Sequence, residues 1–404
     1  MSAAACPGLP QDLSFTLANN TSGDGTFDVL YQIAPAGAML SGPPGFTLPQ
    51  YDIIDFSATF TPMCATPGTD FEGLLTATGN SHIASATIYA SIFSSLTEPE
   101  ALAPINNEGR SRPAGAAVDG KMYVIGGEIS GGRAQTVEEF DPATGLWTTQ
   151  ANWMPYPASN ICTGVIGTDI YVPGGYDATS TYLDTLQVYY TTVDAWGTIT
   201  SDPLPVPLAG HGCGVLDGKL YVFGGVTTGG TYSVATYVYD PMAAAGARWT
   251  QLSDMLTVRG YFATVTAGGL IYAIGGRNLA ITDLATVEAY YPATNMWYTL
   301  NPLNTARGAP GAYAWGYDLV VCGGGWDNYY RSCERYDTNS GIVGTWEMIG
   351  GGLITGRRSF AYATLPGGMY AVAGYNGSYL TAAERLSIFE CPSCGSFIPL
   401  ALKK

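Results

Sequence analysis

The sequence predicts an all-β protein in which a small β-sandwich precedes six similar sheets that close into a ring. Three observations lead to this fold class. A pair of glycines follows a short apolar strand at a regular interval, and a tryptophan recurs at the same interval. The composition, with 53 Gly, 25 Pro and 28 Tyr, favours turns and strands over helices.

The glycine pair ends a short strand in each repeat. The copies read YVIGGE (123–128), YVPGGY (171–176), YVFGGV (221–226), YAIGGR (272–277), VVCGGG (320–325) and YAVAGY (370–375), so that Ala373 takes the first glycine's place in the sixth. We expect close backbone packing and positive φ angles to require these glycines. They are Gly126, Gly127, Gly174, Gly175, Gly224, Gly225, Gly275, Gly276, Gly323 and Gly324.

Two further landmarks follow each pair in fixed order. An apolar strand ends in an aromatic residue: VEEFDP (137–142), LQVYYT (186–191), TYVYDP (236–241), VEAYYP (287–292) and CERYDT (333–338). A tryptophan then lies on the expected outer strand, where its large apolar surface would fill the gap between neighbouring sheets. These residues are Trp147, Trp196, Trp249, Trp297 and Trp346.

The three landmarks together resemble the kelch repeat, whose period is about 50 residues. The resemblance covers residues of about 110–400 in six copies. It implies that each copy is one four-stranded antiparallel blade and that residues 110–404 form a six-bladed kelch-type β-propeller.

The sixth blade needs an outer strand, because no tryptophan follows its aromatic residue, Phe389. Two segments could supply that strand, SFIPLAL (396–402) at the C-terminus or IYASIFSSL (88–96) with Phe93 in the tryptophan's place. The spacing from Phe389 favours the C-terminal segment.

Residues 1–97 contain no glycine-pair motif. LSFTLAN (13–19), GTFDVLYQIA (25–34), YDIIDFSATFTP (51–62), FEGLLTATG (71–79) and IASATIYASIF (83–93) alternate in polarity between turn residues. This pattern predicts an immunoglobulin-like β-sandwich. It resembles the modules that accompany repeats in bacterial surface proteins. Residues 98–109 are expected to link it to the propeller.

Composition limits the partners and the compartment. The net charge is −16, and the 16 Lys and Arg residues do not cluster along the sequence, so we expect no nucleic-acid binding. No apolar run is long enough for a membrane span. The N-terminus lacks signal-peptide features, and an even count of eight cysteines suits an oxidising compartment. We expect an extracellular or cell-surface protein whose signal peptide has been removed.

The cysteines suggest four pairings. Cys322 and Cys333 lie on consecutive strands of one blade, and Cys162 and Cys213 lie at equivalent points of adjacent blades. Cys6 and Cys64 are the two cysteines of the sandwich. Cys391 and Cys394 form a CPSC motif, which we interpret as structural because no second metal-binding pair accompanies it.

No sequence motif indicates catalysis, and no catalytic residue is assigned. The two histidines, His82 and His211, fall in different predicted domains. Copper-radical oxidases on kelch-type rings need paired His and Tyr ligands, so this activity is the least favoured. NNTSGDGTFD (19–28) offers Asp24 and Asp28 for Ca²⁺ but departs from EF-hand spacing, and an ordinary turn is the favoured interpretation. We expect no cofactor.

The loops that follow the glycine pairs vary in sequence and contain many aromatic residues. If they project at one end of the ring, they form an aromatic rim suited to protein partners or glycans. The predicted rim residues are Tyr176, Tyr182, Tyr232, Trp326, Tyr329, Tyr330, Tyr375 and Tyr379. We therefore predict a non-catalytic surface scaffold or adhesion protein, able to bind protein partners that include copies of itself. A carbohydrate-binding or carbohydrate-acting protein is the alternative.

Overall fold

The structure, a computed structural model, describes residues 11–18, 25–34, 38–41, 45–48, 53–62, 70–79, 82–93, 99–280, 282–386 and 396–397. Contacts divide the chain into two units. Residues 1–95 and 388–404 form the first, and residues 96–387 form the second. Within the described residues, no helix has the length and apolar character to cross a membrane.

The first unit contains two antiparallel sheets. Their strand orders are β1-β5-β3 and β37-β7-β6-β2-β4. The predicted strands are present, but the immunoglobulin-like identity of the unit stays a prediction. The strands are β1 (Gln11–Ala18), β2 (Gly25–Ala34), β3 (Ala38–Ser41), β4 (Gly45–Leu48), β5 (Ile53–Pro62), β6 (Asp70–Gly79), β7 (His82–Phe93) and β37 (Ser396–Phe397).

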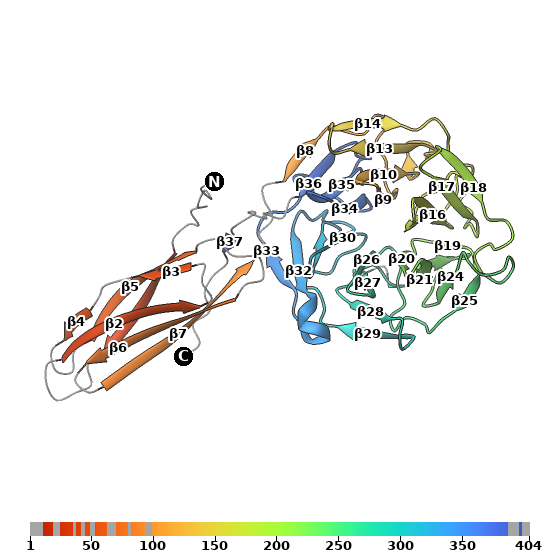
Figure 1. Ribbon diagram of the computed structural model, residues 1–404. Coiled ribbons are helices and arrows are strands. Elements are labelled where there is room, and N and C mark those ends of the chain that lie inside the picture. The colour runs from red at the N-terminus through yellow and green to blue at the C-terminus, as the bar shows by residue number, and fades with distance from the viewer. Residues whose placement is uncertain are drawn as a thin grey trace. The chain divides into compact units, whose positions relative to one another are not determined.

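The second unit is a ring of six four-stranded antiparallel sheets, here called blades 1 to 6 in chain order (Figure 1). Blades 1 to 3 contain β9 (Ala114–Val118), β10 (Lys121–Ile125), β13 (Val137–Asp141) and β14 (Leu146–Thr149); β15 (Gly164–Ile166), β16 (Asp169–Pro173), β17 (Leu186–Tyr190) and β18 (Ala195–Thr198); and β20 (Gly212–Leu216), β21 (Lys219–Phe223), β24 (Thr236–Tyr239) and β25 (Trp249–Gln251).

Blades 4 to 6 follow the same pattern. They contain β26 (Ala263–Ala267), β27 (Leu270–Ile274), β28 (Val287–Tyr291) and β29 (Met296–Leu300); β30 (Gly311–Trp315), β31 (Asp318–Cys322), β32 (Cys333–Asp337) and β33 (Glu347–Ile349), with the 3₁₀ helix η1 (Thr338–Val343); and β34 (Ala361–Leu365), β35 (Gly368–Val372), β36 (Ala383–Leu386) and β8 (Glu100–Leu102). Short loop strands complete the unit: β11 (Glu128–Ile129), β12 (Gly132–Arg133), β19 (Leu208–Ala209), β22 (Val226–Thr227) and β23 (Thr231–Tyr232).

The sixth blade is closed by β8, and the favoured sequence prediction is wrong on this point. Residues Glu100–Leu102, assigned to the linker, pair with β36. Ser396–Phe397 of the proposed closing segment pairs instead with β7 of the first unit, and β7 includes most of the other candidate segment. This outer strand has three residues, Glu100–Leu102, and none of them is aromatic. The tryptophan that identifies the outer strand of the other blades is therefore absent here.

The glycine pairs end the second strand of each blade in the left-handed backbone region. Gly126 and Gly127 have φ angles of 59° and 106°. A Cβ on Gly126 would lie 2.6 Å from the carbonyl oxygen of Ala158 in the next blade. Both the backbone angle and the close approach therefore favour glycine. Ala373 replaces it in blade 6 and adopts φ 62°.

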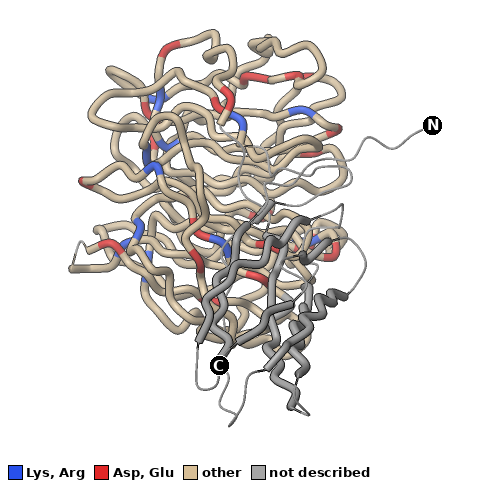
Figure 2. Tube along the Cα trace, turned by 90° about the vertical axis from the view of Figure 1, so that its left-hand side faces the viewer, with Lys and Arg blue, Asp and Glu red and all other residues tan. Residues whose placement is uncertain are grey.

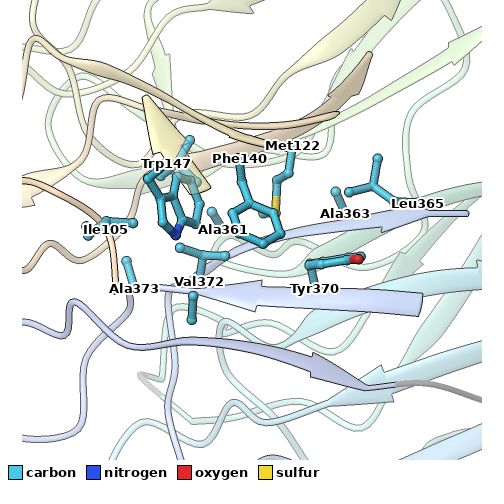
Figure 3. Close-up of a cluster of buried hydrophobic side chains, with 12 residues drawn as sticks. Ile105, Met122, Phe140, Trp147, Ala361, Ala363, Leu365, Tyr370, Val372 and Ala373 are labelled. Carbon is cyan, nitrogen blue, oxygen red and sulfur yellow. The ribbon is translucent and has the colours of Figure 1, made fainter. Parts of the chain in front are cut away.

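The tryptophans lie on or beside the outer strands and pack between blades. Figure 3 shows Trp147 and Phe140 of blade 1 against Tyr370 and Val372 of blade 6, in one buried cluster. The Phe140 and Tyr370 rings are 5.9 Å apart between centroids. The indole Nε1 of Trp147 donates a hydrogen bond to the carbonyl of Ala103 (2.8 Å). Each such ring supplies apolar area that neither blade could bury alone.

A buried Arg–Glu pair lies inside four of the six blades. The arginine precedes the first strand, and the glutamate lies on the third. The pairs are Arg110–Glu138, Arg259–Glu288, Arg307–Glu334 and Arg357–Glu384, in blades 1, 4, 5 and 6. Blade 2 has Ala158 and Gln187 at these positions, and blade 3 has Leu208 and Tyr237.

Candidate functional site

Three arginines and one tryptophan from four blades come together beside the channel. Two of them lie in segments that precede a blade's first strand, and two lie in loops that follow a glycine pair. We call Arg112, Arg277, Arg358 and Trp326 the arginine–tryptophan cluster. The guanidinium carbons of Arg358 and Arg277 lie 4.0 and 4.1 Å from the centre of the Trp326 ring, and that of Arg112 lies 5.8 Å away. These distances are in the range of cation–π contacts. Arg112 precedes blade 1 and Arg358 precedes blade 6, so the cluster forms because the ring closes.

The three arginines differ in their ion pairing. Arg112 pairs with Glu128, and Arg277 pairs with Asp283 at 3.3 Å. Arg358 is 8% exposed, and no ion pair to it occurs among the described residues. Its Nε donates to the Trp326 carbonyl at 3.1 Å. Burial lowers the pKa of Arg358, and the charge of Arg112 lowers it further. The cluster thus has three guanidinium groups, and two carboxylates, those of Glu128 and Asp283, pair with it.

All eight predicted rim residues are half-buried, and Trp326 together with four of the tyrosines lies in or around this cluster. Tyr329 and Tyr375 pack against each other, with centroids 6.1 Å apart, and against Arg358. Tyr379 packs on Tyr375, and its hydroxyl donates to Glu128 at 3.0 Å. Tyr232 packs on Tyr261, whose ring contacts Trp326.

Three predicted rim residues make other contacts. Tyr176 and Tyr182 form an edge-to-face pair with centroids 4.8 Å apart, and Arg133 lies over Tyr176. Tyr330 lies 5.3 Å from the guanidinium carbon of Arg307, which belongs to a blade interior. These three side chains make no contact with Trp326 among the described contacts, and the binding role of all eight rim residues stays a prediction.

A ring of six backbone hydrogen bonds lies directly beside the cluster. In each blade, one residue of the segment that leads into the first strand has a positive φ, between 51° and 60°. Each donates its N–H to the carbonyl of its counterpart in the preceding blade, at 2.7–3.1 Å, and the ring closes from blade 1 to blade 6. The residues are Arg112, Asn160, Gly210, Tyr261, Ala309 and Ser359. This ring fixes the backbone from which the cluster side chains extend.

The channel encloses a cavity of about 490 Å³ lined mainly by the first strands of the blades. Its wall is mostly Ala, Gly, Val and Thr. Tyr362 of blade 6 reaches Thr264 of blade 4, where its hydroxyl accepts from the backbone N–H (2.9 Å) and donates to the carbonyl (3.2 Å). Gly311 in blade 5 leaves room for blade 6 here, because a Cβ on it would lie 2.5 Å from the Phe360 ring and 3.2 Å from the Tyr362 Cβ. Burial raises the pKa of Tyr362.

A disulfide and a histidine lie together in the cavity wall. Cys162 and Cys213 are bonded, with Cα atoms 5.6 Å apart, and His211 is 5% exposed beside them. Burial lowers the pKa of His211 to about 4, and the Pro173 carbonyl opposes this shift in part. The predicted Cys322–Cys333 disulfide also forms. Cys6, Cys64, Cys391 and Cys394 lie outside the described residues, as do Asp24 and Phe389.

The sequence analysis missed the arginines of the cluster. A signal was available, because two of them directly follow or nearly follow a blade-interior arginine, in RSR (110–112) and RR (357–358). The first arginine of each doublet pairs with a glutamate inside the blade, and the last enters the cluster. Arg112 and Arg358 are 246 residues apart and become neighbours only when the ring closes. No local sequence pattern indicates this contact.

Figure 2 marks the charged positions of the described chain, where Lys and Arg are sparse and several lie near Asp or Glu. The 16 Lys and Arg residues are half as many as the 32 Asp and Glu residues. Three arginines around one tryptophan therefore form an unusual concentration of positive charge for this chain.

Comparisons with known proteins agree with this architecture. The chain is 28% identical to Kelch-like protein 15 of Danio rerio over 232 residues, 52% of this chain and 38% of that protein. It is 33% identical to Kelch-like protein 23 of Homo sapiens over 198 residues, 48% and 33% of the two chains. It thus matches between 33% and 38% of the length of these curated relatives.

Spermatocyte protein spe-26 of Caenorhabditis elegans is 25% identical over 283 residues, 69% of this chain and 48% of that protein. The solved structure of YjhT superposes with a TM-score of 0.60 at 16% identity, over 75% of this chain and 99% of that one, which supports the fold. The model of the KLHDC2/KLHL20/DRC7 Kelch-repeats domain matches residues 113–324, just over half of the 404 residues. The chain belongs to this kelch-repeat family.

Proposed function

We propose that this chain is a non-catalytic binding protein that takes up a carboxylate group of a protein partner at the arginine–tryptophan cluster. The observation behind the proposal is Arg358, an arginine with 8% exposure that has no ion pair among the described residues. The four buried arginines inside the blades each pair with a glutamate, and Arg277 pairs with Asp283.

Electrostatics favours an anionic ligand. A guanidinium group removed from water is costly unless a carboxylate or an equivalent acceptor pairs with it. Three arginines against Glu128 and Asp283 leave one positive charge in the cluster. A planar carboxylate that reached Arg358 would neutralise this charge and could accept two parallel hydrogen bonds.

The surrounding geometry suits a segment of a protein partner. Tyr329, Tyr375 and Tyr379 border the cluster with half-buried rings that offer apolar area and a polar hydroxyl. Such residues stabilise protein interfaces around a buried charged contact. We place this activity outside the cell or at its surface, and the two disulfides of the propeller support that setting.

Carbohydrate binding is the second candidate, because aromatic faces also stack on sugar rings. The Trp326 ring already packs against two guanidinium groups at 4.0 and 4.1 Å, so its π surface is used within the chain. This contact favours the carboxylate proposal over sugar stacking at Trp326.

Peptide selection tests the proposal. Random dodecapeptides with free C-termini are selected against the full chain, and the enriched peptides are measured by calorimetry. We expect peptides with Asp, Glu or an essential C-terminal carboxylate, whose affinity falls at least about tenfold in Arg358→Met. Arg331→Met is the matched control, because Arg331 is exposed and its Nε donates to the Leu353 carbonyl.

Enriched peptides without carboxylate dependence, or with equal affinity for Arg358→Met, would contradict the proposal. A glycan array probed with the same two variants tests the second candidate. Self-association that is lost in Arg358→Met would identify a second copy of this chain as the partner.

A further inference from the structure

We propose that Cys162, His211 and Cys213 form a redox-dependent zinc site in the wall of the propeller channel. The disulfide is its oxidised state, and reduction by a dithiol releases two thiolates that bind Zn²⁺ together with His211. This inference is independent of the proposed binding function, because none of its residues belongs to the arginine–tryptophan cluster.

The three ligand atoms are already close together. The two Sγ atoms and a ring nitrogen of His211 all lie within 4.8 Å of one another. Cys162 precedes β15 of blade 2, whereas Cys213 lies on β20 of blade 3. Tetrahedral zinc with Zn–S bonds of about 2.3 Å separates two sulfurs by roughly 3.8 Å. Both cysteines line the cavity, which gives the sulfurs space to move apart.

The histidine is the independent sign of a ligand. It is 5% exposed and lines the cavity, and among the described residues neither Nδ1 nor Nε2 makes a hydrogen bond of normal geometry, although the Pro173 carbonyl lies close enough to act on the ring. A buried polar group without a partner is costly. The backbone holds the ring closely, because a Cβ on Gly225 would lie 2.6 Å from the His211 Cβ, and one on Gly174 would lie 3.2 Å from Cε1. A bound metal would give one ring nitrogen the partner it lacks.

The chemistry balances without a further reactant. The disulfide takes two electrons and two protons from the dithiol, which becomes a cyclic disulfide. Zn²⁺ then displaces the two thiol protons into solvent, and the neutral imidazole loses none. Two thiolates cancel the charge of Zn²⁺, which suits a cavity wall whose described residues include no Asp or Glu. Sulfur and imidazole ligands favour zinc over Mg²⁺ or Ca²⁺.

The site supplies three protein ligands, so a fourth position stays open toward the cavity. Zinc sites with three protein ligands bind water or a small ligand in the fourth position. Cys322 and Cys333, the other described disulfide, have no histidine or acidic residue grouped with them among the described residues. They therefore serve as an internal comparison.

Cobalt titration of the full chain tests the site. Cys6, Cys64, Cys391 and Cys394 are first replaced by serine, so that two disulfides remain. The protein is reduced with a resin-bound dithiol, separated from it, and titrated anaerobically with Co²⁺ and then Zn²⁺. We expect one equivalent of Co²⁺ with tetrahedral d–d and thiolate charge-transfer absorption, displaced by Zn²⁺. The oxidised protein should show neither band.

Variants identify the ligands. His211→Ala should weaken Co²⁺ binding at least about tenfold, and Cys162→Ser with Cys213→Ser should abolish both bands. Cys322→Ser with Cys333→Ser should leave them unchanged, and circular dichroism checks that each variant is folded. His211→Asn replaces His211→Ala if the latter unfolds. Absence of the bands in reduced protein, or bands that persist without His211 or without Cys162 and Cys213, would overturn the proposal.

Discussion

Blades 1, 4, 5 and 6 differ from blades 2 and 3 in the interaction that connects the third strand to the segment before the first strand. In blade 5, Arg307 pairs with Glu334 at 3.1 Å and donates to the carbonyls of Gly323 (2.8 Å) and Ser332 (2.9 Å). Glu334 also accepts the backbone N–H of Asn304. The ion pair thus connects three separate segments of one blade.

Blade 2 keeps this connection without charge. Gln187 accepts the N–H of Tyr156 at 2.9 Å and donates to the carbonyl of the same residue at 3.1 Å, where Ala158 replaces the arginine. Blade 3 has Leu208 and Tyr237 instead. Both charges are absent together, which avoids an unpaired buried ion. The disulfide Cys162–Cys213 joins these same two blades.

Loss of one partner of a buried pair should have the largest effect. Arg307→Met leaves Glu334 buried without a cation, and we expect the free energy of unfolding to fall by about 3–5 kcal/mol. Urea denaturation at pH 7 measures this loss. The double variant Arg307→Leu with Glu334→Gln imitates the neutral blades and should recover at least about 2 kcal/mol. A double variant as unstable as Arg307→Met would break the comparison.

Disulfide removal should be nearly as costly, and more so between blades than within one. Cys162 and Cys213 are 51 residues apart, whereas Cys322 and Cys333 are 11 apart. The loop-entropy relation predicts losses of about 4 and about 3 kcal/mol for the paired serine substitutions. Thermal unfolding of both double variants gives the order. The reverse order would contradict the loop-entropy account, in which the disulfide that closes the longer loop contributes more stability.

The neutral link of blade 2 should have a smaller effect. Gln187→Ala leaves the Tyr156 N–H without its acceptor, and we expect a loss of about 2 kcal/mol. Gln187→Glu should be worse at pH 7, because a buried carboxylate without an arginine has a raised pKa. Its stability should therefore fall as the pH rises above about 4.3, the unfolded-state value. Unfolding curves between pH 4.5 and about 7.5 test the slope, and a flat profile relative to wild type would contradict the account.

Much of the propeller could be predicted from the sequence, because its landmarks have local causes. Gly126 and its counterparts mark positive φ angles, and Trp147 marks an outer strand, so both recur at a fixed spacing. The closing strand β8 was missed because Glu100–Leu102 has no such landmark. Its place is set by pairing with β36, at the other end of the repeat array.

The candidate site was predictable only in part. Trp326, Tyr329 and Tyr375 could be found from their place after the glycine pairs. The sequence could not show that Arg112 and Arg358 lie close together, because only ring closure makes them neighbours. The ion-pair partner of each arginine likewise depends on the tertiary structure. The repeat interval places Arg357 in line with Arg259 and Arg307, but it does not show what Arg358 contacts.

The most direct measurement compares two kinds of arginine: Arg307, which is ion-paired inside a blade, and Arg358, which we propose binds a ligand carboxylate. Urea unfolding of Arg307→Met and Arg358→Met is measured side by side at pH 7. We predict a loss of about 3–5 kcal/mol for Arg307→Met and less than about 1 kcal/mol, or a gain, for Arg358→Met. A loss for Arg358→Met as large as that for Arg307→Met would contradict the account, because Arg358 would then be a structural residue.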